Sequence, residues 1–192
     1  MTTRITTLIS KSVMGILRLA FLGSIVTAAP LLTAGQTTHE HPTEHATPPA
    51  LVQIVRDATQ QFNDVNAAGL AGYGPAFGCV SGPDHGAMGI HYIKGELVAD
   101  GEIDAAHPEA LIYEPVGDRR KLVGVEYIVD AATWLANHKN TPPMLEGQAF
   151  QFVGSPNRYG IPAFFELHVW AWRDNPNGAF VDWNNKVSCE LQ

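Results

Sequence analysis

The sequence predicts an α+β domain in which one N-terminal helix precedes a mostly antiparallel, curved β-sheet or small β-barrel. Two observations predict this class. Over residues 50–68, apolar residues recur at three- and four-residue steps, which is the period of an amphipathic helix. From residue 87 onward, short runs rich in Val, Ile, Tyr, Phe and Trp are bounded by Gly, Pro, Asn and Asp, a pattern typical of strands. Five or six short strands after one helix favour a curved sheet with the helix over one face or mouth.

Residues 1–28 are expected to be a cleavable secretory signal peptide. The segment carries Arg4, Lys11 and Arg18 without any acid, and an apolar run over residues 16–26 precedes small residues at 27–29. A membrane-spanning helix needs roughly twenty apolar residues, so an uncleaved anchor is the weaker alternative. Cleavage removes three cationic residues and no acid, which changes the net charge from −7 to −10. We therefore expect a periplasmic or secreted protein without a nucleic acid partner or a stable membrane span.

Residues 29–49 are expected to form a flexible, histidine-rich tail, because the segment has too few apolar residues to order itself. His39, His41 and His45 alternate with acids, and such a cluster could bind Zn, Cu or Ni weakly. The alternative is a solvated linker with chance histidines. Residues 50–192 are expected to be a single α+β domain.

The first helix is expected to start at Thr47 and Pro48, since Thr can cap a helix and Pro suits its first position. It should run to about Ala68 and end at Gly69. A glycine-rich connector, 69–86, should follow.

Strands are expected at 87–94, 110–114, 121–129, 149–153 and 163–172, with a sixth near Phe180. Between the third and fourth, Asp130 should cap a short helix over residues 131–138 that the prolines at 142 and 143 end.

The chain contains two cysteines, Cys79 and Cys189. We expect them to form a disulfide, because an exported chain meets an oxidising compartment. Closing so long a loop would contribute on the order of 4–5 kcal/mol in the chain-entropy model. A pair of metal-binding thiolates is the alternative.

The run over residues 163–172 points to chemistry. Strand alternation places Glu166 and His168 on the same face as Phe164, Trp170 and Trp172. An acid and an imidazole among large aromatic residues suit metal ligands, or a base with its orienting acid, in a lined pocket.

Two other strands offer partners. His91 shares a face with Gly89, which should leave space beside the imidazole, and His85 precedes the strand in a turn that could fold back over its end. Glu126 lies in an otherwise apolar run, and Glu114 ends a strand in a similar setting. Buried acids are expensive unless they are paired or metal-bound.

The predicted metal ligands are His91, His168 and Glu126, with Glu166 as the alternative carboxylate. Imidazole nitrogens and a carboxylate suit a divalent transition metal, Zn or Cu, with one position open to water or a small-molecule substrate. Glu166 and His85 are the predicted catalytic residues, moving protons beside the metal. His85 could alternatively be a fourth ligand.

Two other functions stay open. One is a periplasmic metal carrier or buffer without turnover, which predicts a closed coordination shell. The other is a metal-free ligand-binding or structural module, in which His91 bonds a backbone carbonyl and Glu166 pairs with Arg158 or Arg173. The sequence does not decide whether the protein is an enzyme.

Three segments, Gly78-Cys79-Val80, residues 86–92 (GAMGIHY) and residues 166–172 (ELHVWAW), together resemble a family of exported bacterial proteins described as hypothetical. The resemblance covers the chain from the first helix to Cys189. It implies a bacterial setting and transfers no activity.

Overall fold

The computed structural model describes residues 49–82 and 84–191. The predicted signal peptide and the histidine-rich tail up to residue 48 lie outside the described residues, as does the expected cap at Thr47. The helical region begins at Ala50, after Pro49.

The predicted single helix over residues 48–68 is wrong, because the structure divides it. Helix α1 (Ala50–Thr59) is followed by a 3₁₀ turn (Gln60–Asn63) and by α2 (Val65–Leu70). Thr59 leaves helical geometry at φ −109° and ψ 3°. The carboxylate of Asp64 then accepts a hydrogen bond from the Asn66 amide and caps α2. The three- and four-residue period continues through the break, so periodicity alone did not reveal it.

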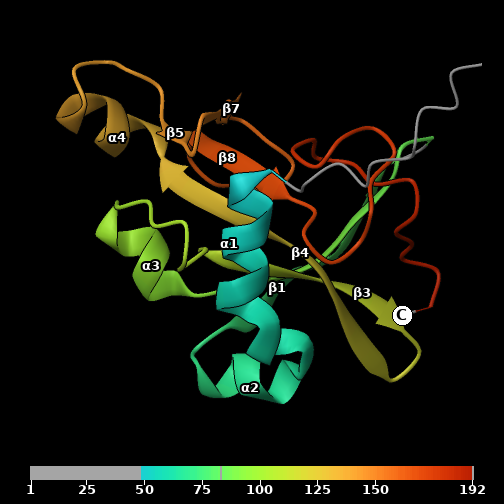
Figure 1. Cartoon of the computed structure of the whole chain (residues 1–192). Coiled ribbons are helices and arrows are strands. Elements are labelled where there is room, and N and C mark those ends of the chain that lie inside the picture. The colour runs from blue at the N-terminus through green and yellow to red at the C-terminus, as the bar shows by residue number, and fades with distance from the viewer. Residues whose placement is uncertain (1–48, 83, 192) are drawn as a thin grey trace, which may run out of the picture. The chain divides into compact units, whose positions relative to one another are not determined.

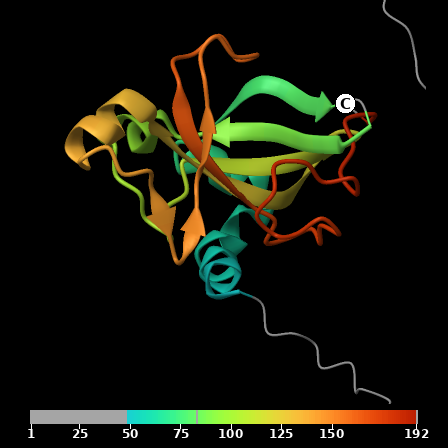
Figure 2. The same ribbon diagram turned by 90° about the horizontal axis from the view of Figure 1, so that it is seen from above.

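Six strands form one antiparallel sheet that curls into a half-barrel, which confirms the predicted fold class (Figures 1 and 2). Their spatial order is β1-β2-β3-β4-β8-β7. The bounds are β1 Gly74–Gly82, β2 Gly86–Ile93, β3 Ala110–Val116, β4 Arg119–Asp130, β7 Gln151–Val153 and β8 Phe164–Val169. β5 (Met144–Leu145) and β6 (Gln148–Ala149) pair separately.

Strand β1 lies within the expected glycine-rich connector and was missed. It is an edge strand with mostly half-buried and exposed residues, so it lacks the apolar alternation that marks an inner strand. Its pairing with β2 is interrupted by a bulge between Ala76 and Cys79. The short helix α3 (Gly95–Asp100) was not predicted either, and it has no buried residue.

Near Phe180, where a sixth strand was expected, the structure has turns. Strand β8 ends at Val169 rather than Trp172. The chain bends there, and the indole of Trp172 donates a hydrogen bond to Thr59 Oγ1 of α1. Trp172 therefore packs against the helix. The prediction from alternation, which placed it on the same face as His168, is wrong for this residue.

The short helix after β4 is confirmed. Helix α4 spans Ala131–Asn137, and the carboxylate of Asp130 accepts a hydrogen bond from the amide of Thr133 at its first turn.

The two faces of the sheet have different coverings. Helix α1 lies across one face (Figure 1), where buried residues such as Leu111, Val125 and Leu167 form the main core with Leu51 and Val55. The neighbouring residues along the same strands point to the other face, which carries the polar side chains considered below.

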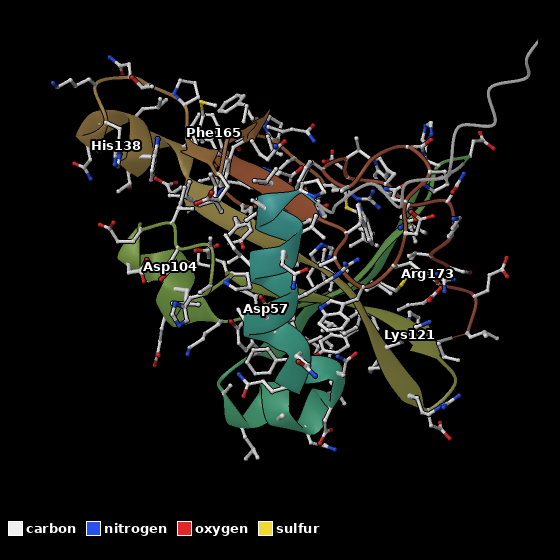
Figure 3. The ribbon with its side chains drawn as sticks, viewed as in Figure 1. Asp57, Asp104, Lys121, His138, Phe165 and Arg173 are labelled. Carbon is white, nitrogen blue, oxygen red and sulfur yellow. A yellow bond between two sulfur atoms is a disulfide. The ribbon has the colours of Figure 1, made fainter. Side chains whose placement is uncertain are left out.

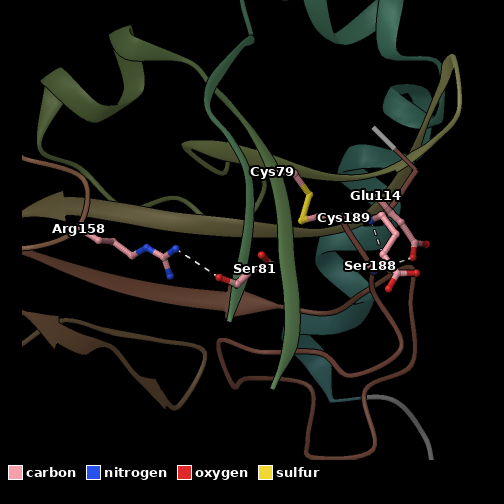
Figure 4. Close-up of a disulfide and its surroundings, with 7 residues drawn as sticks. Cys79, Ser81, Glu114, Arg158, Ser188 and Cys189 are labelled. Atoms are coloured by element: carbon pink, nitrogen blue, oxygen red, sulfur yellow. Dashed lines mark hydrogen bonds between the residues drawn. A yellow bond between two sulfur atoms is a disulfide. The ribbon is translucent and has the colours of Figure 1, made fainter. Parts of the chain in front are cut away.

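The predicted disulfide is present. Cys79 of β1 is bonded to Cys189, 110 residues later, with their Cα atoms 5.7 Å apart (Figure 4). The C-terminal segment also pairs with β2 through a bridge between Ala87 and Asn184. The bond points to an oxidising compartment.

Candidate metal centre

Three strands bring His91, Glu126 and His168 together. Glu126 of β4 is directly opposite His168 of β8, and opposite Ala110 of β3 on its other side. His91 of β2 reaches the same place, and its Nε2 lies 3.3 Å from Glu126 Oε2. One ligand atom from each of the three residues lies within 4.8 Å of the others. This group could hold a metal ion.

The three side chains are buried, with exposed fractions of 4% for His91, 4% for Glu126 and 0% for His168. Among the described residues, three buried side-chain nitrogen or oxygen atoms have no hydrogen-bond partner: His91 Nδ1, His168 Nδ1 and His168 Nε2. All three belong to this group. A buried polar atom without a partner lowers the stability of a protein by about 1–3 kcal/mol. A bound metal ion would offset part of this cost.

The pKa shifts in this group follow mainly from burial. Burial lowers the pKa of His91 to about 4, an effect that the nearby Gly89 carbonyl partly offsets. Burial and then the neighbouring His91 hold the pKa of His168 well below its ordinary value. Burial and then the Glu166 carboxyl raise the pKa of Glu126 well above its ordinary value. Both imidazoles are therefore neutral at pH 7, which is the form that binds metal.

A second group overlaps the first at His168. Glu166, His168 and Asp182 also bring one ligand atom each within 4.8 Å of the others, and His168 Nδ1 lies 3.6 Å from Asp182 Oδ1. Burial raises the pKa of Glu166 to about 7 and raises that of Asp182. A carboxylate beside the second nitrogen of a ligating imidazole is a common way to fix its orientation.

Asp182 was not predicted as part of this site. It lies on the loop after β8, and only the return of that loop over the sheet places it beside His168. No periodicity in the sequence records such a contact.

His85 lies outside both groups. It is exposed, its ring centroid is 6.5 Å from that of Trp183, and the two residues line a surface pocket that Asp182 also borders. The structure therefore brings His91, Glu126, Glu166 and His168 together but leaves His85 at the surface.

Gly89 was expected from the sequence to leave space beside His91, but the structure gives it another role. It has φ +107°, and a Cβ there would meet the backbone oxygen of Tyr113 at 2.7 Å. Gly89 is thus required by the close approach of β3. Gly124, two residues before Glu126, has a related role, since a Cβ there would meet the backbone oxygen of Val169 at 2.7 Å.

Of the two contacts expected for a metal-free centre, the backbone carbonyl of Gly89 lies near enough to His91 to raise its pKa, whereas the ion pair of Glu166 with an arginine is missing among the described residues. The guanidinium of Arg158 donates to the backbone oxygen of Ser81 (Figure 4). Arg173 lies 3.7 Å from Glu114, so neither arginine pairs with Glu166. Glu114 also accepts a hydrogen bond from the Ser188 amide beside the disulfide. Glu114 is therefore a structural acid.

A cavity of about 300 Å³ opens beside the centre, with His91 and Glu126 in its wall. Most of its remaining lining is apolar, and its aromatic members are Phe77, Tyr159 and Phe164. Cavities of this kind, apolar with a few polar groups, are typical small-molecule sites.

The helices of residues 49–82 and 84–191 include none long and apolar enough to cross a bilayer. No family model matches the chain, and searches of curated proteins and of solved structures found no match either.

Proposed function

We propose that the chain is an exported protein that binds one transition metal ion through His91, Glu126 and His168 and acts on a small molecule in the adjoining cavity. Two imidazoles and a carboxylate are the donor set of many catalytic zinc sites and of non-haem iron(II) sites. Zn and Cu are the metals expected first. A bound metal of this kind would polarise a substrate oxygen or activate water.

The observation that carries this proposal is the set of three unpartnered imidazole nitrogens. A structural histidine in a protein interior normally has its polar atoms hydrogen-bonded. Here two histidines from different strands leave three nitrogens unpaired beside a buried carboxylate. A metal ion held by one nitrogen of each imidazole would satisfy two of these three atoms and compensate the charge of the carboxylate, and Asp182 lies 3.6 Å from the remaining atom, His168 Nδ1.

Glu166 is the proposed proton-transfer residue. It is diagonal to Glu126 on the same face of the sheet, and its carboxyl belongs to the group around His168. His85 is proposed to exchange protons with solvent from the surface pocket that Asp182 borders. Asp182 would orient His168.

The cavity favours this function over a metal carrier without turnover. A carrier needs a closed coordination shell, whereas His91 and Glu126 both line a space large enough for a small molecule. Three protein ligands with an adjoining cavity are the arrangement of a site that keeps a coordination position for substrate.

The test is the metal content of mature protein purified from the periplasm without a polyhistidine tag. Near one ion per chain is expected in the wild type and in a variant that lacks residues 35–47. His91→Ala and His168→Ala should each lose the ion. His138→Ala is the matched control, because His138 extends from the end of α4, is exposed and stacks on Trp134 (Figure 3).

Failure to bind metal even after reconstitution with Zn(II), Cu(II) and Fe(II) would refute the proposal. Retention of the ion by the double variant H91A/H168A would also refute this site. Loss of the ion only on deletion of residues 35–47 would assign the metal to the tail.

A further inference from the structure

The cavity beside the metal centre carries an inference about the kind of molecule it takes. It is enclosed by residues from β1, β2, α3, β4, the segment before β8, and β8 itself. Its volume of about 300 Å³ is at the lower end of the range for small-molecule pockets. A molecule with about one ring fits such a space.

The charges around the cavity select against an ionic ligand. The ionisable side chains among its described lining residues are His91, Glu126 and Tyr159, and the lining contains no lysine or arginine. Arg158 is adjacent in sequence, but its guanidinium is directed to Ser81 and lies over the rings of Tyr159 and Trp183. An anion would thus lose its hydration without gaining a cationic side chain, and the charge of a bound divalent ion would already be offset by Glu126 and by the nearby Glu166 and Asp182.

A bulge in β1 places the aromatic ring of Phe77 at the cavity. The bulge in β1 holds Phe77 at φ 61°, a left-handed conformation that is unfavourable for a bulky residue. Phe77 is 51% exposed, yet it lines the cavity, and its ring centroid is 5.2 Å from that of Tyr159. Bulges beside functional sites commonly redirect a side chain in this way.

We propose, building on the metal site of the proposed function, that the cavity binds an uncharged, largely apolar molecule of about one ring. Its oxygen or nitrogen faces His91 and Glu126, and its ring lies between Phe77, Tyr159 and Phe164. Aromatic side chains at the rim and on the floor supply contact area to a flat ring. The single polar end of the cavity fixes the orientation of the ligand.

The experiment compares phenol and benzoate as probes, by isothermal titration calorimetry with the metal-loaded mature protein. The two molecules share a ring and differ in charge at pH 7. Phenol is expected to bind at least tenfold more tightly than benzoate. Equal binding of the two probes, or preference for benzoate, would overturn the inference.

Variants of α3 locate the binding. Val98 lines the cavity and Glu96 does not, although both belong to α3 and Glu96 is exposed. Val98→Trp should fill the cavity and weaken phenol binding at least tenfold, whereas Glu96→Trp should leave it unchanged. Unchanged phenol binding by Val98→Trp would place the probe elsewhere and overturn the inference.

Metal content measured in the same samples separates the two proposals. Val98→Trp should retain the metal ion while losing the probe. If the wild type binds phenol over benzoate through Val98 but holds no metal, the proposed function fails and the ligand class stands. If it holds metal but shows no such preference, the ligand class fails alone.

Discussion

The two faces of the curled sheet treat their buried polar groups in opposite ways. On the face that α1 covers, the hydroxyls of Tyr113 and Tyr127 donate hydrogen bonds to the backbone oxygens of Phe62 and Ala105. On the other face, His91 and His168 leave three nitrogens unpaired. Both faces are built from the same strands. The difference in hydrogen bonding therefore comes from the side chains that each face carries. A paired polar group is explained by the fold itself, whereas an unpaired buried cluster needs another explanation, which a metal ion held by His91, Glu126 and His168 could supply.

The largest effect should come from the helix-covered face. Leu111→Ala removes a fully buried side chain from the main core and should lower the free energy of unfolding by about 2–5 kcal/mol. Urea denaturation measures this change. Leu70→Ala is the control, because Leu70 is 92% exposed and its loss should change little. Metal bound per folded chain should stay at the wild-type value, and a loss of metal would show that the two faces are not independent.

Glu109, a buried acid just before β3, should give the next largest effect, a pH dependence of the free energy of unfolding. Glu109 is 1% exposed, its Oε2 accepts a hydrogen bond from the Ile128 amide, and burial raises its pKa from 4.5 to about 8. The folded state therefore prefers the protonated acid. The contribution of Glu109 to the free energy of unfolding is present in full below about pH 4.5 and is lost as pH rises through about 8.

Glu109→Gln keeps an acceptor for Ile128 and should remove on the order of 3 kcal/mol from the decline in unfolding free energy over this window. Denaturation at several pH values measures it. Glu96→Gln, at an exposed acid, should leave the decline intact. An unchanged pH dependence in Glu109→Gln would mean that Glu109 is ionised in the folded protein, as a surface acid is.

The smallest effect should depend on whether metal is bound. In the presence of a chelator, His168→Leu replaces two unpaired nitrogens by apolar atoms and should raise the free energy of unfolding by about 1–3 kcal/mol. With free metal at a hundred times its dissociation constant, the wild type should gain about 2.7 kcal/mol that the variant lacks. Thermal unfolding with and without metal measures both. Destabilisation by His168→Leu even with chelator would mean that His168 is an ordinary core histidine.

Much of the sheet could be predicted because its inner strands are long and apolar. Strands β2, β3, β4 and β8 each combine β-branched and aromatic residues over six to twelve positions. The edge strand β1 and helix α3 escaped prediction because neither buries a continuous apolar face. Local sequence also did not reveal the break after Thr59, since Phe62 continues the apolar period through it.

The members of the site on inner strands could be predicted for the same reason. Glu126 and His168 interrupt apolar runs, and alternation shows which face they occupy. Residues on loops could not be predicted in this way. Asp182 approaches His168 and His85 stays at the surface because of how the chain returns over the sheet, and loop paths depend on tertiary contacts that no short window of sequence contains.

The alternation of β4 links correct folding to assembly of the centre. Val125 and Tyr127 point into the core, and Glu126 between them points to the candidate metal centre. A slip of one residue in the pairing of β4 would place the carboxylate in the core and two apolar side chains in the site. Misregistered chains would therefore lose stability and ligands together. The strand register that buries the core is thus the same register that positions the site residues. A chain that has reached its stable fold has therefore also aligned them.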